Sequence, residues 1–472
     1  MQFEKPTSGP IFDVVQRARA AQAVVDTYDQ TRVDELVDAA GWAIIEPTRN
    51  QSLAERAVAD TGIGNVADKV RKNYRKTLGL LRDLRGTKSV GVIARDPEKG
   101  ITEIARPVGV VCAVTPSTNP GATPVNKIIN AIKGRNAVIV APSPKGLGTS
   151  TELVGYIHAQ FDRIGAPRDL VQVLPAPINK QATADLMALV DLVVATGSQA
   201  NVRSAYASGT PAFGVGAGNV AGIVDETADI EATADRIVRS KTFDNATSCS
   251  SENSVIVVAS AKEKLLAALE SRGAYLLDAA QTDRLQALMW PNSKLSGDVT
   301  GKSAAAIAAL AGFAELAKRE PKILLVEQSA DSVGPDFPYS GEKLSPVLTF
   351  YTVPDFDACA SLVARIYQWQ GAGHSVGLHT MRPERAMQLG LTLPVSRVIV
   401  SQAHCIAVGG SFDNGLPFSL SMGCGTWGGN NFSENMNYKH YLNITRIAEP
   451  IPEVVPTEND LLSTYFEKYG AH

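Results

Sequence analysis

The sequence has few cysteines and no long hydrophobic run, and these absences narrow the class of protein. Five of its 472 residues are cysteines, spread widely along the chain with no CxxC pair: Cys112, Cys249, Cys359, Cys405 and Cys424. They are too sparse for a disulfide framework or a zinc cluster. No apolar run approaches the ~20 residues of a membrane span, and the N-terminus lacks the apolar core of a signal peptide. We therefore expect a cytoplasmic protein with no metal site and no membrane association.

An excess of either charge is also absent. The chain has 45 Lys and Arg residues against 48 Asp and Glu residues, for a formal net charge of -3. This balance, without any basic run, gives no support to nucleic-acid binding. Aromatic residues make up 6% of the sequence and hydrophobic residues 44%, as in ordinary globular proteins. A chain of 472 residues is too long for one core, so we expect at least two domains.

Hydrophobic periodicity divides the chain into a helical part and alternating parts. Residues up to about 85 carry apolar side chains at helical spacing. A turn containing Pro and Gly then separates two strands, which predicts a projecting hairpin around 90–107. From Thr115 to Val224, short apolar runs alternate with amphipathic stretches, and the pattern restarts at Ile223. This alternation is typical of doubly wound parallel sheets, so the sequence predicts two successive α/β units.

Cys249 lies in the most informative segment, FDNATSCSSENSVIV at 243–257. Its small polar neighbours would let a substrate carbon approach the sulfur, and backbone N–H groups in the loop could stabilise a thiolate or an oxyanion. A single cysteine is more often a small hydrophobic core residue. Taken alone, the segment leaves both interpretations open.

Asn119 is a second candidate for chemistry, in the segment TPSTNP at 115–120 between an apolar strand and a helix. An Asn amide at a strand end can donate a hydrogen bond to a developing oxyanion. Asn before Pro is also a common turn residue, so this position has a structural interpretation as well.

Two loops are candidates for a nucleotide cofactor. The segment NAVIVAPSPKG at 136–146 ends a strand without the carboxylate that often binds an adenosine ribose. Ser143 and Lys145 stand there instead and suit a phosphorylated ribose, although Lys145 could equally be a solvated loop residue. In ATGSQANVRSAY at 195–206, Gly197 lets the backbone approach an anion at a helix N-terminus. The chain has no GxGxxG motif, so this second signal is weak.

These segments, in this order, resemble the aldehyde dehydrogenase superfamily and in particular its coenzyme A-acylating branch, from about Val14 to Ala448. TPSTNP resembles the motif of the oxyanion Asn, IKGRNAVIVAPSPK the adenosine-side strand and loop, and FDNATSCSSENS the nucleophile loop. EKLSPVL resembles the motif whose Glu, here Glu342, holds the nicotinamide ribose. The resemblance implies that Cys249 is the nucleophile. It implies cofactor-binding positions at Thr115, Pro142, Ser143, Lys145, Gly197, Ser198 and Glu342.

The resemblance also implies the architecture. We expect an α/β aldehyde dehydrogenase-like fold with a Rossmann-type cofactor-binding domain at 1–216 and an α/β catalytic domain at 217–427. The hairpin around 90–107, together with the C-terminal segment and tail at 428–472, would form an oligomerisation element. Homodimers, or homotetramers built from two dimers, are the usual assemblies.

One departure from the family pattern concerns the water-activating base. Hydrolytic members carry a Glu followed by Leu-Gly-Gly upstream of the nucleophile, and aligning the Gly pair with Ala217 and Gly218 places Val215 at the Glu position. Val215 lies 34 residues before Cys249, the spacing expected for that Glu. Because Val cannot activate water, a thioester would persist until a thiol attacked it. This departure indicates an acyl-coenzyme A product rather than a free acid.

The expected reaction is ping-pong, with aldehyde and coenzyme A as the small-molecule partners and NADP, with NAD as the alternative, as the hydride acceptor. His374 could assist with the thiol proton or be structural. C-terminal segments such as LPVSRVIVSQ and GCGTWGGNNFSENMNYKH resemble the acylating enzymes for sulfoacetaldehyde and succinate semialdehyde more than those for acetaldehyde, and we favour sulfoacetaldehyde. Arg397 could supply positive charge to the substrate, although a structural role is favoured. The rival hypotheses are a hydrolytic aldehyde dehydrogenase and an inactive scaffold.

Overall fold

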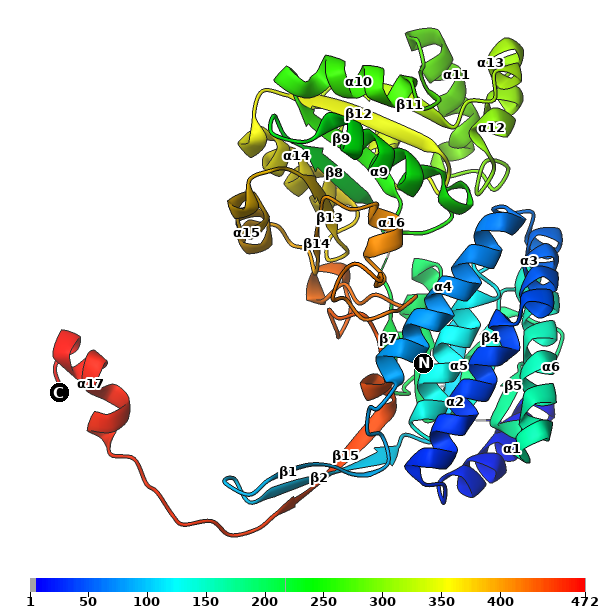
Figure 1. Cartoon of the computed structure of the whole chain (residues 1–472), viewed down its shortest axis with the longest axis vertical. Coiled ribbons are helices and arrows are strands. Elements are labelled where there is room, and N and C mark those ends of the chain that lie inside the picture. The colour runs from blue at the N-terminus through cyan, green and yellow to red at the C-terminus, as the bar shows by residue number, and fades with distance from the viewer. Residues whose placement is uncertain (1–5, 217, 472) are drawn as a thin grey trace.

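The computed structural model describes residues 6–216 and 218–471. Two parallel sheets, each with its own helices, lie one above the other, and a small antiparallel sheet projects beside them (Figure 1). The α/β class predicted from the alternating pattern is confirmed. Ala217, used above to align the Gly pair, lies outside the described residues.

Four helices form the N-terminal part, as the helical periodicity predicts. Their bounds are α1 Pro10–Val25, α2 Gln30–Ile45, α3 Pro47–Thr61 and α4 Val66–Leu84. Side chains of Asp29 and Asn65 cap α2 and α4 by accepting backbone N–H groups of the first turn. Helix α2 packs against α4, α5 and α6, which ties this part to the first sheet.

The first sheet has five parallel strands in the order β5-β4-β3-β6-β7. Its strands are β3 Val110–Thr115, β4 Ala137–Pro142, β5 Val171–Val173, β6 Leu192–Ala195 and β7 Ala212–Gly214. The connecting helices are α5 Ala122–Lys133, α6 Leu147–Ile164, α7 Lys180–Leu189 and α8 Gln199–Ala207. The chain leaves β3 toward β4 and later returns to β6 on the other side, so the carboxyl ends of β3 and β6 form a switch point. Ligands of open α/β sheets bind at such a point.

The second sheet has seven parallel strands in the order β10-β11-β12-β9-β8-β13-β14. Its strands are β8 Val220–Val224, β9 Glu252–Val258, β10 Ala274–Leu276, β11 Ile323–Gln328, β12 Val347–Val353, β13 Val376–His379 and β14 Val398–Val400. Its helices are α9 Ile230–Thr242, α10 Lys262–Glu270, α11 Ala279–Met289, α12 Ala304–Leu310, α13 Ala314–Lys318, α14 Phe356–Trp369, α15 Pro383–Thr392 and α16 His404–Ala407. Cys249 lies just before the central strand β9.

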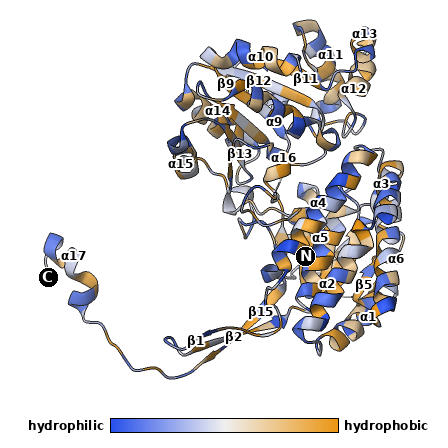
Figure 2. Cartoon of the chain, in the orientation of Figure 1, coloured by the Kyte–Doolittle hydropathy of each residue, from blue (hydrophilic) through white to orange (hydrophobic). Residues whose placement is uncertain are grey.

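After α16 the chain returns to the first unit. Phe418, Met436 and Tyr441 belong to the hydrophobic core of that unit. The predicted domain boundaries at 216 and 427 stay predictions, and the packing of Phe418 favours an end of the catalytic domain before 427. Hydrophobic residues gather on the strands and the inward helix faces (Figure 2). Among the described residues, no helix combines the length and apolar character needed to cross a membrane.

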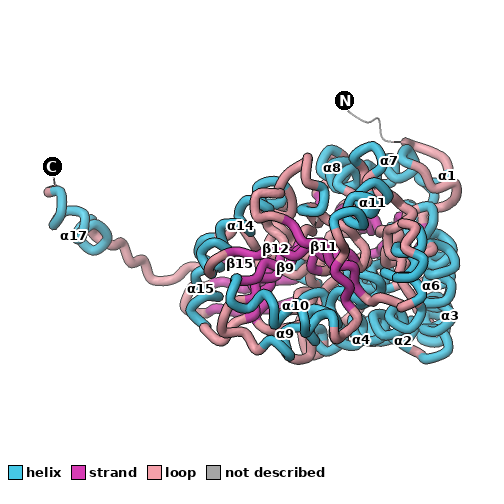
Figure 3. The backbone as a smooth tube through the Cα atoms, turned by 90° about the horizontal axis from the view of Figure 1, so that it is seen from above, coloured by secondary structure: helices cyan, strands magenta, loops and turns pink. Residues whose placement is uncertain are grey.

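The third sheet contains the hairpin predicted around 90–107. Strands β1 Gly91–Asp96 and β2 Ile101–Pro107 pair with each other, and β15 Leu442–Ala448 pairs antiparallel with β2. Residues 449–471 then lead away from the body and end in α17 Glu458–Tyr469 (Figure 3). This segment, here called the C-terminal arm, exposes large apolar side chains such as Val454 at 85% and Leu461 at 71%.

Candidate active site

The loop that carries Cys249 is held by a buried carboxylate. Asp244, Asn245 and Ala246 have left-handed φ values of 50°, 53° and 57°, which are uncommon without glycine. Asp244 is fully buried and accepts hydrogen bonds from the ammonium groups of Lys69 at 3.2 Å and Lys72 at 2.6 Å, both on α4. This ion-pair cluster fixes the nucleophile loop against the N-terminal helices.

A cavity of about 440 Å3 opens beside Cys249 at the switch point of the first sheet. Five of the residues that the sequence predicts for catalysis or cofactor binding line it together: Asn119, Gly197, Ser198, Cys249 and Glu342. The sixth, His374, is buried with its Nε2 atom 3.6 Å from the Cys249 Sγ atom. The structure therefore brings together residues that lie up to 255 positions apart in the sequence.

The remaining predicted cofactor residues lie at the edge of this cavity or beyond it. Thr115 and Pro142 end the paired strands β3 and β4, and the backbone N–H of Ser143 donates to the Thr115 carbonyl at 3.1 Å. Lys145 is exposed and lines a neighbouring cavity of about 560 Å3. Ser117 lines both cavities, so the two adjoin.

Val215 occupies the wall of the 440 Å3 cavity and is buried. Among the described residues that line this cavity, Glu342 is the only carboxylate. Gly218 lies directly against the nucleophile, because a Cβ atom there would come within 1.9 Å of the Cys249 carbonyl oxygen. The wall facing the sulfur is thus apolar and tightly packed, which leaves the position expected for a water-activating base without one.

Asn119 has a partner that sequence reasoning missed. The Lys72 ammonium donates to the Asn119 Oδ1 atom at 2.7 Å, while the same nitrogen contacts Asp244. The Oδ1 atom is thereby occupied, and the amide nitrogen is the end of Asn119 that remains to donate elsewhere. A signal existed in the sequence, since Lys69, Lys72 and Lys76 form a basic stripe at helical spacing.

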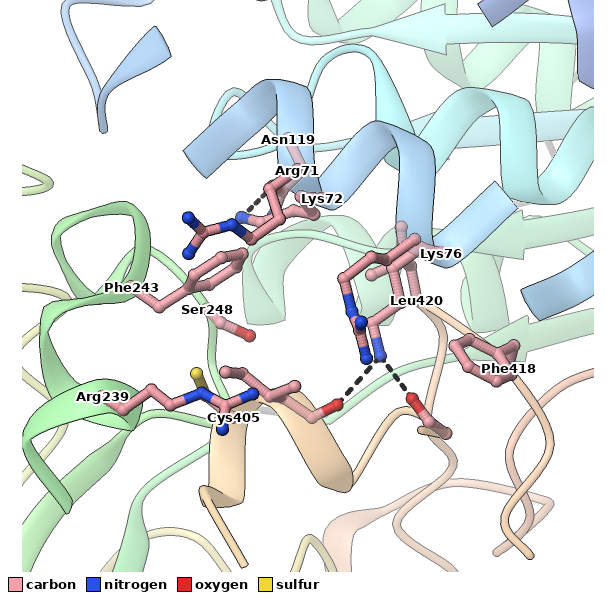
Figure 4. A pocket seen from close by; sticks show the side chains of 13 residues that line it. Arg71, Lys72, Lys76, Asn119, Arg239, Phe243, Ser248, Cys405, Phe418 and Leu420 are labelled. Carbon is pink, nitrogen blue, oxygen red and sulfur yellow. Dashed lines mark hydrogen bonds between the residues drawn. The ribbon is translucent and has the colours of Figure 1, made fainter. Parts of the chain in front are cut away.

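A further cavity of about 340 Å3 is lined by Phe243 and Ser248 of the nucleophile loop (Figure 4). Asn119, Ser248 and Leu420 line both this cavity and the 440 Å3 cavity, so the two meet next to Cys249. Below, these two are called the smaller and the larger cavity. Five cationic side chains line the smaller cavity: Arg71, Lys72, Arg75 and Lys76 from α4, and Arg239 from α9. No acidic residue is among the described residues that line it. Nothing in the sequence patterns described above predicts this basic cavity.

Burial favours the neutral forms of the reacting groups. Burial, and secondly the Glu342 carboxylate, raise the pKa of the Cys249 thiol to about 12. Burial also raises the pKa of Glu342 to about 8 and, together with the Arg397 charge, lowers the pKa of His374 to about 3. His374 is therefore a neutral imidazole whose Nδ1 atom lies 2.7 Å from the Ser375 hydroxyl. If Nδ1 carries the ring proton and donates it to Ser375, the Nε2 lone pair faces the Cys249 thiol.

Arg397 does not face a substrate. Its guanidinium is buried and donates to the Asn435 side chain at 2.7 Å and to three backbone carbonyls, those of His374, Gly423 and Ser433. The suggestion that Arg397 supplies charge to the substrate is wrong. Its structural role is to hold the backbone of His374 in place.

The chain is similar to known proteins over nearly its whole length. Residues 2–282 match the aldehyde dehydrogenase family, and a curated relative from Cupriavidus necator is 63% identical over 97% of this chain and 92% of its own length. The chain belongs to the aldehyde dehydrogenase family. That relative is named sulfoacetaldehyde dehydrogenase (acylating).

Solved structures of this family of dehydrogenases extend the comparison. An acetylating aldehyde dehydrogenase from Geobacillus thermoglucosidasius is 34% identical, with a TM-score of 0.90 over 95% of this chain and 98% of the other. A propionaldehyde dehydrogenase from Rhodopseudomonas palustris, solved with bound CoA and an acylated cysteine, is 25% identical, with a TM-score of 0.82 over 95% and 97% of the two chains.

The position of Cys249 in the wall of the 440 Å3 cavity generates a first prediction. Replacing Cys249 by Ala should lower the rate of reduced-cofactor formation by at least about 10³-fold, because covalent capture precedes hydride transfer. The affinity for the nicotinamide cofactor should stay within about threefold, as measured by fluorescence titration. Cys424→Ala is the matched control, since Cys424 is buried near the same loop but lines neither cavity. Substantial turnover by the Cys249 variant would contradict the assignment.

Proposed function

We propose that this aldehyde dehydrogenase oxidises sulfoacetaldehyde and transfers the acyl group to coenzyme A, forming sulfoacetyl-coenzyme A. The observation that carries the substrate is the basic 340 Å3 cavity that meets the cofactor-side cavity beside Cys249. The name of the Cupriavidus necator relative supports the same substrate.

The geometry suits covalent aldehyde oxidation. The Cys249 sulfur attacks the carbonyl carbon, its proton passing to Nε2 of His374, and the carbonyl oxygen becomes an oxyanion between the Asn119 amide and the backbone N–H of Cys249. A nicotinamide bound in the larger cavity supplies the acceptor for the hydride that leaves the carbon. Glu342 and the Ser198 hydroxyl would hold that group. The residues present fit a dinucleotide. Ser143 offers a buried hydroxyl without a protein partner among the described residues, and the 440 Å3 cavity adjoins the 560 Å3 cavity.

Release of the acyl group favours a thiol over water. The position of the water-activating base in hydrolytic members is aligned with Val215, which cannot accept a proton from water. An incoming thiol needs little activation compared with water, because its own pKa is near 8.5. The bound CoA and acylated cysteine of the Rhodopseudomonas palustris relative support this step.

The anionic end of the substrate would lie among arginines. Of the five cations in the smaller cavity, Lys72 is held by Asn119 and Asp244, and Lys76 donates to the carbonyls of Ile406, Gly409 and Gly410. Arg71 has only a 3.6 Å contact with Asp68, and Arg75 and Arg239 form no ion pair with the described residues. Guanidinium groups bind multi-oxygen anions through several N–H donors. A sulfonate is compact and permanently charged, which fits a small cavity better than a long acyl tail.

This assignment predicts an ordered specificity. The specificity constant for sulfoacetaldehyde should exceed those for succinate semialdehyde, acetaldehyde and propanal by about tenfold or more, with an acyl-coenzyme A product. Arg239→Gln should raise the KM for sulfoacetaldehyde by roughly tenfold, about the value of one charged hydrogen bond, and leave propanal unchanged. Arg236→Gln, on the same helix but outside the cavity, is the control. A tenfold preference for acetaldehyde or propanal would reject the anionic substrate, and a free acid formed without coenzyme A would reject acylation.

We infer further that NADP serves at least as well as NAD. The strand end at Pro142 lacks a ribose-binding carboxylate, and the exposed Lys145 lines the adjoining cavity together with Lys302. Lys145→Glu should raise the KM for NADP several-fold more than the KM for NAD, because it places a negative charge near the ribose phosphate. Steady-state kinetics with both cofactors measure this, with Lys264→Glu on exposed α10 as the control. Equal effects on both cofactors would count against the assignment.

We also propose that the C-terminal arm docks on a second copy of the chain, giving a dimer or a tetramer of dimers. Its apolar side chains lie outside the hydrophobic cores, and exposure of that kind is costly unless a partner covers it. Replacing Leu461 and Leu462 together by Lys should reduce the mass measured by light scattering. Glu458→Lys, a change on the same helix at a polar position, should leave the mass unchanged. An unaltered assembly in the double variant would exclude the arm as an interface.

A further inference from the structure

Lys72 has contacts that neither ion pairing nor substrate binding alone explains. Its ammonium lies 2.7 Å from the Asn119 Oδ1 atom, 2.6 Å from the Asp244 Oδ2 atom and 5.4 Å from the centre of the Phe243 ring. The residue is only 5% exposed although it lies on an otherwise largely polar helix. It therefore joins α4, the loop after β3 and the nucleophile loop at one nitrogen; Figure 4 shows its bond to Asn119.

The contact with Asn119 determines which end of the amide faces the nucleophile. An ammonium group has only donors, so it can bind the oxygen of an amide and not its nitrogen. With Oδ1 held by Lys72, the Nδ2 group is the end available toward the cavities that meet beside Cys249. A flipped amide would present an acceptor to the developing oxyanion, which would repel it.

The contact with Asp244 links this orientation to the position of the sulfur. Asp244 lies five residues before Cys249 in the strained segment with left-handed backbone, and its carboxylate is fully buried. Asn119 belongs to the first unit and Asp244 to the second. One ammonium thus sets the separation between the amide donor and the nucleophile loop across the junction of the two units.

The charge of Lys72 adds an electrostatic effect. A cation bound to the carbonyl oxygen of an amide withdraws electron density from it and makes the N–H groups stronger donors. The carboxylate of Asp244 offsets the charge locally, so the effect reaches the oxyanion chiefly through the Asn119 amide. This arrangement would stabilise negative charge that develops in the transition state.

We propose that Lys72 is a positioning residue for the oxyanion: it holds the Asn119 amide with its N–H groups toward the carbonyl oxygen and strengthens them as donors. The inference requires aldehyde oxidation at Cys249 and is independent of which aldehyde is the substrate. Its test therefore uses propanal, which has no anionic end, beside sulfoacetaldehyde.

Lys69 offers a matched control. It lies on the same helix, is 4% exposed, and contacts the same Asp244 oxygen at 3.2 Å, but its other partner is the Thr118 carbonyl and not the Asn119 amide. Lys72→Met should lower kcat for propanal by about 10- to 100-fold with little change in the KM for the cofactor, less than the roughly 10²- to 10³-fold expected for Asn119→Ala. Lys69→Met should lower kcat clearly less than Lys72→Met does, because it removes one partner of Asp244 but leaves the Asn119 amide held by Lys72.

A double-mutant cycle separates positioning from general support of the fold. In an Asn119→Ala background, Lys72→Met should cause little further loss, because the group through which it acts is gone. Lys72→Gln keeps a hydrogen-bond donor without the charge and should give an intermediate rate. If the Met variant does not fold, the Gln variant alone decides. Lys72→Gln must then be slower than the parent enzyme, and the Lys72→Gln, Asn119→Ala double variant must be as fast as the Asn119→Ala single variant.

Three outcomes would overturn the inference. Equal losses in the Lys69 and Lys72 variants would show that both act only through Asp244. Full additivity of Lys72→Met with Asn119→Ala would show that Lys72 does not act through the amide. A loss confined to sulfoacetaldehyde, with propanal unaffected, would make Lys72 a substrate-binding cation instead.

Discussion

The buried carboxylate of Asp244 is the contact on which the arrangement of this site depends. It belongs to the second α/β unit, yet its partners Lys69, Lys72 and the Asn65 backbone N–H come from the first. A buried carboxylate is strongly destabilising unless it is paired and hydrogen-bonded. Any movement of the strained loop that broke these contacts would therefore cost free energy, which holds the loop before Cys249 in one position. The desolvated Asp244 keeps its pKa below the ordinary value because two ammonium groups compensate for burial. The sulfur is thereby placed relative to α4 and not only relative to its own sheet.

The two sheets supply complementary ends to the site. The first contributes the carboxyl ends of β3 and β6, where loops carry Asn119 and Gly197, and the second contributes the loop that enters β9. The reacting carbon would therefore lie between the nucleotide-binding edge of the first sheet and the nucleophile before the second sheet. Neither sheet supplies both parts. This explains why both units are needed, and why the chain returns after α16 so that Leu420 and Met422 close the cavity between them.

The fold class and several candidate site residues could be predicted from the sequence. The features that could not be predicted all depend on tertiary packing. The fold class followed from alternating apolar runs, and Cys249, Asn119 and Glu342 followed from motifs that keep their order along the chain. The basic cavity did not, because the lysines and arginines of α4 have the spacing of a solvated helix face, and only tertiary packing decides that this face covers the nucleophile. Arg397 shows the reverse case. Its charge left open a role in binding the substrate anion, but three backbone carbonyls and one side chain occupy its donors. Residue type and spacing cannot predict these contacts.

The electrostatics beside Cys249 bear on how its thiol becomes reactive. Burial raises the pKa of the thiol to about 12 and the pKa of Glu342 to about 8, so both groups are mostly neutral near pH 7, beside an imidazole whose pKa burial lowers to about 3. Glu342 and Ser198 would hold the nicotinamide cofactor, whose positive charge would favour the thiolate form of a nearby cysteine. Binding in the larger cavity would thus activate Cys249 for an aldehyde that arrives through the smaller, basic cavity. Because the two cavities are distinct and share only Asn119, Ser248 and Leu420, an anionic substrate in the basic cavity would leave the 440 Å3 cavity to the cofactor.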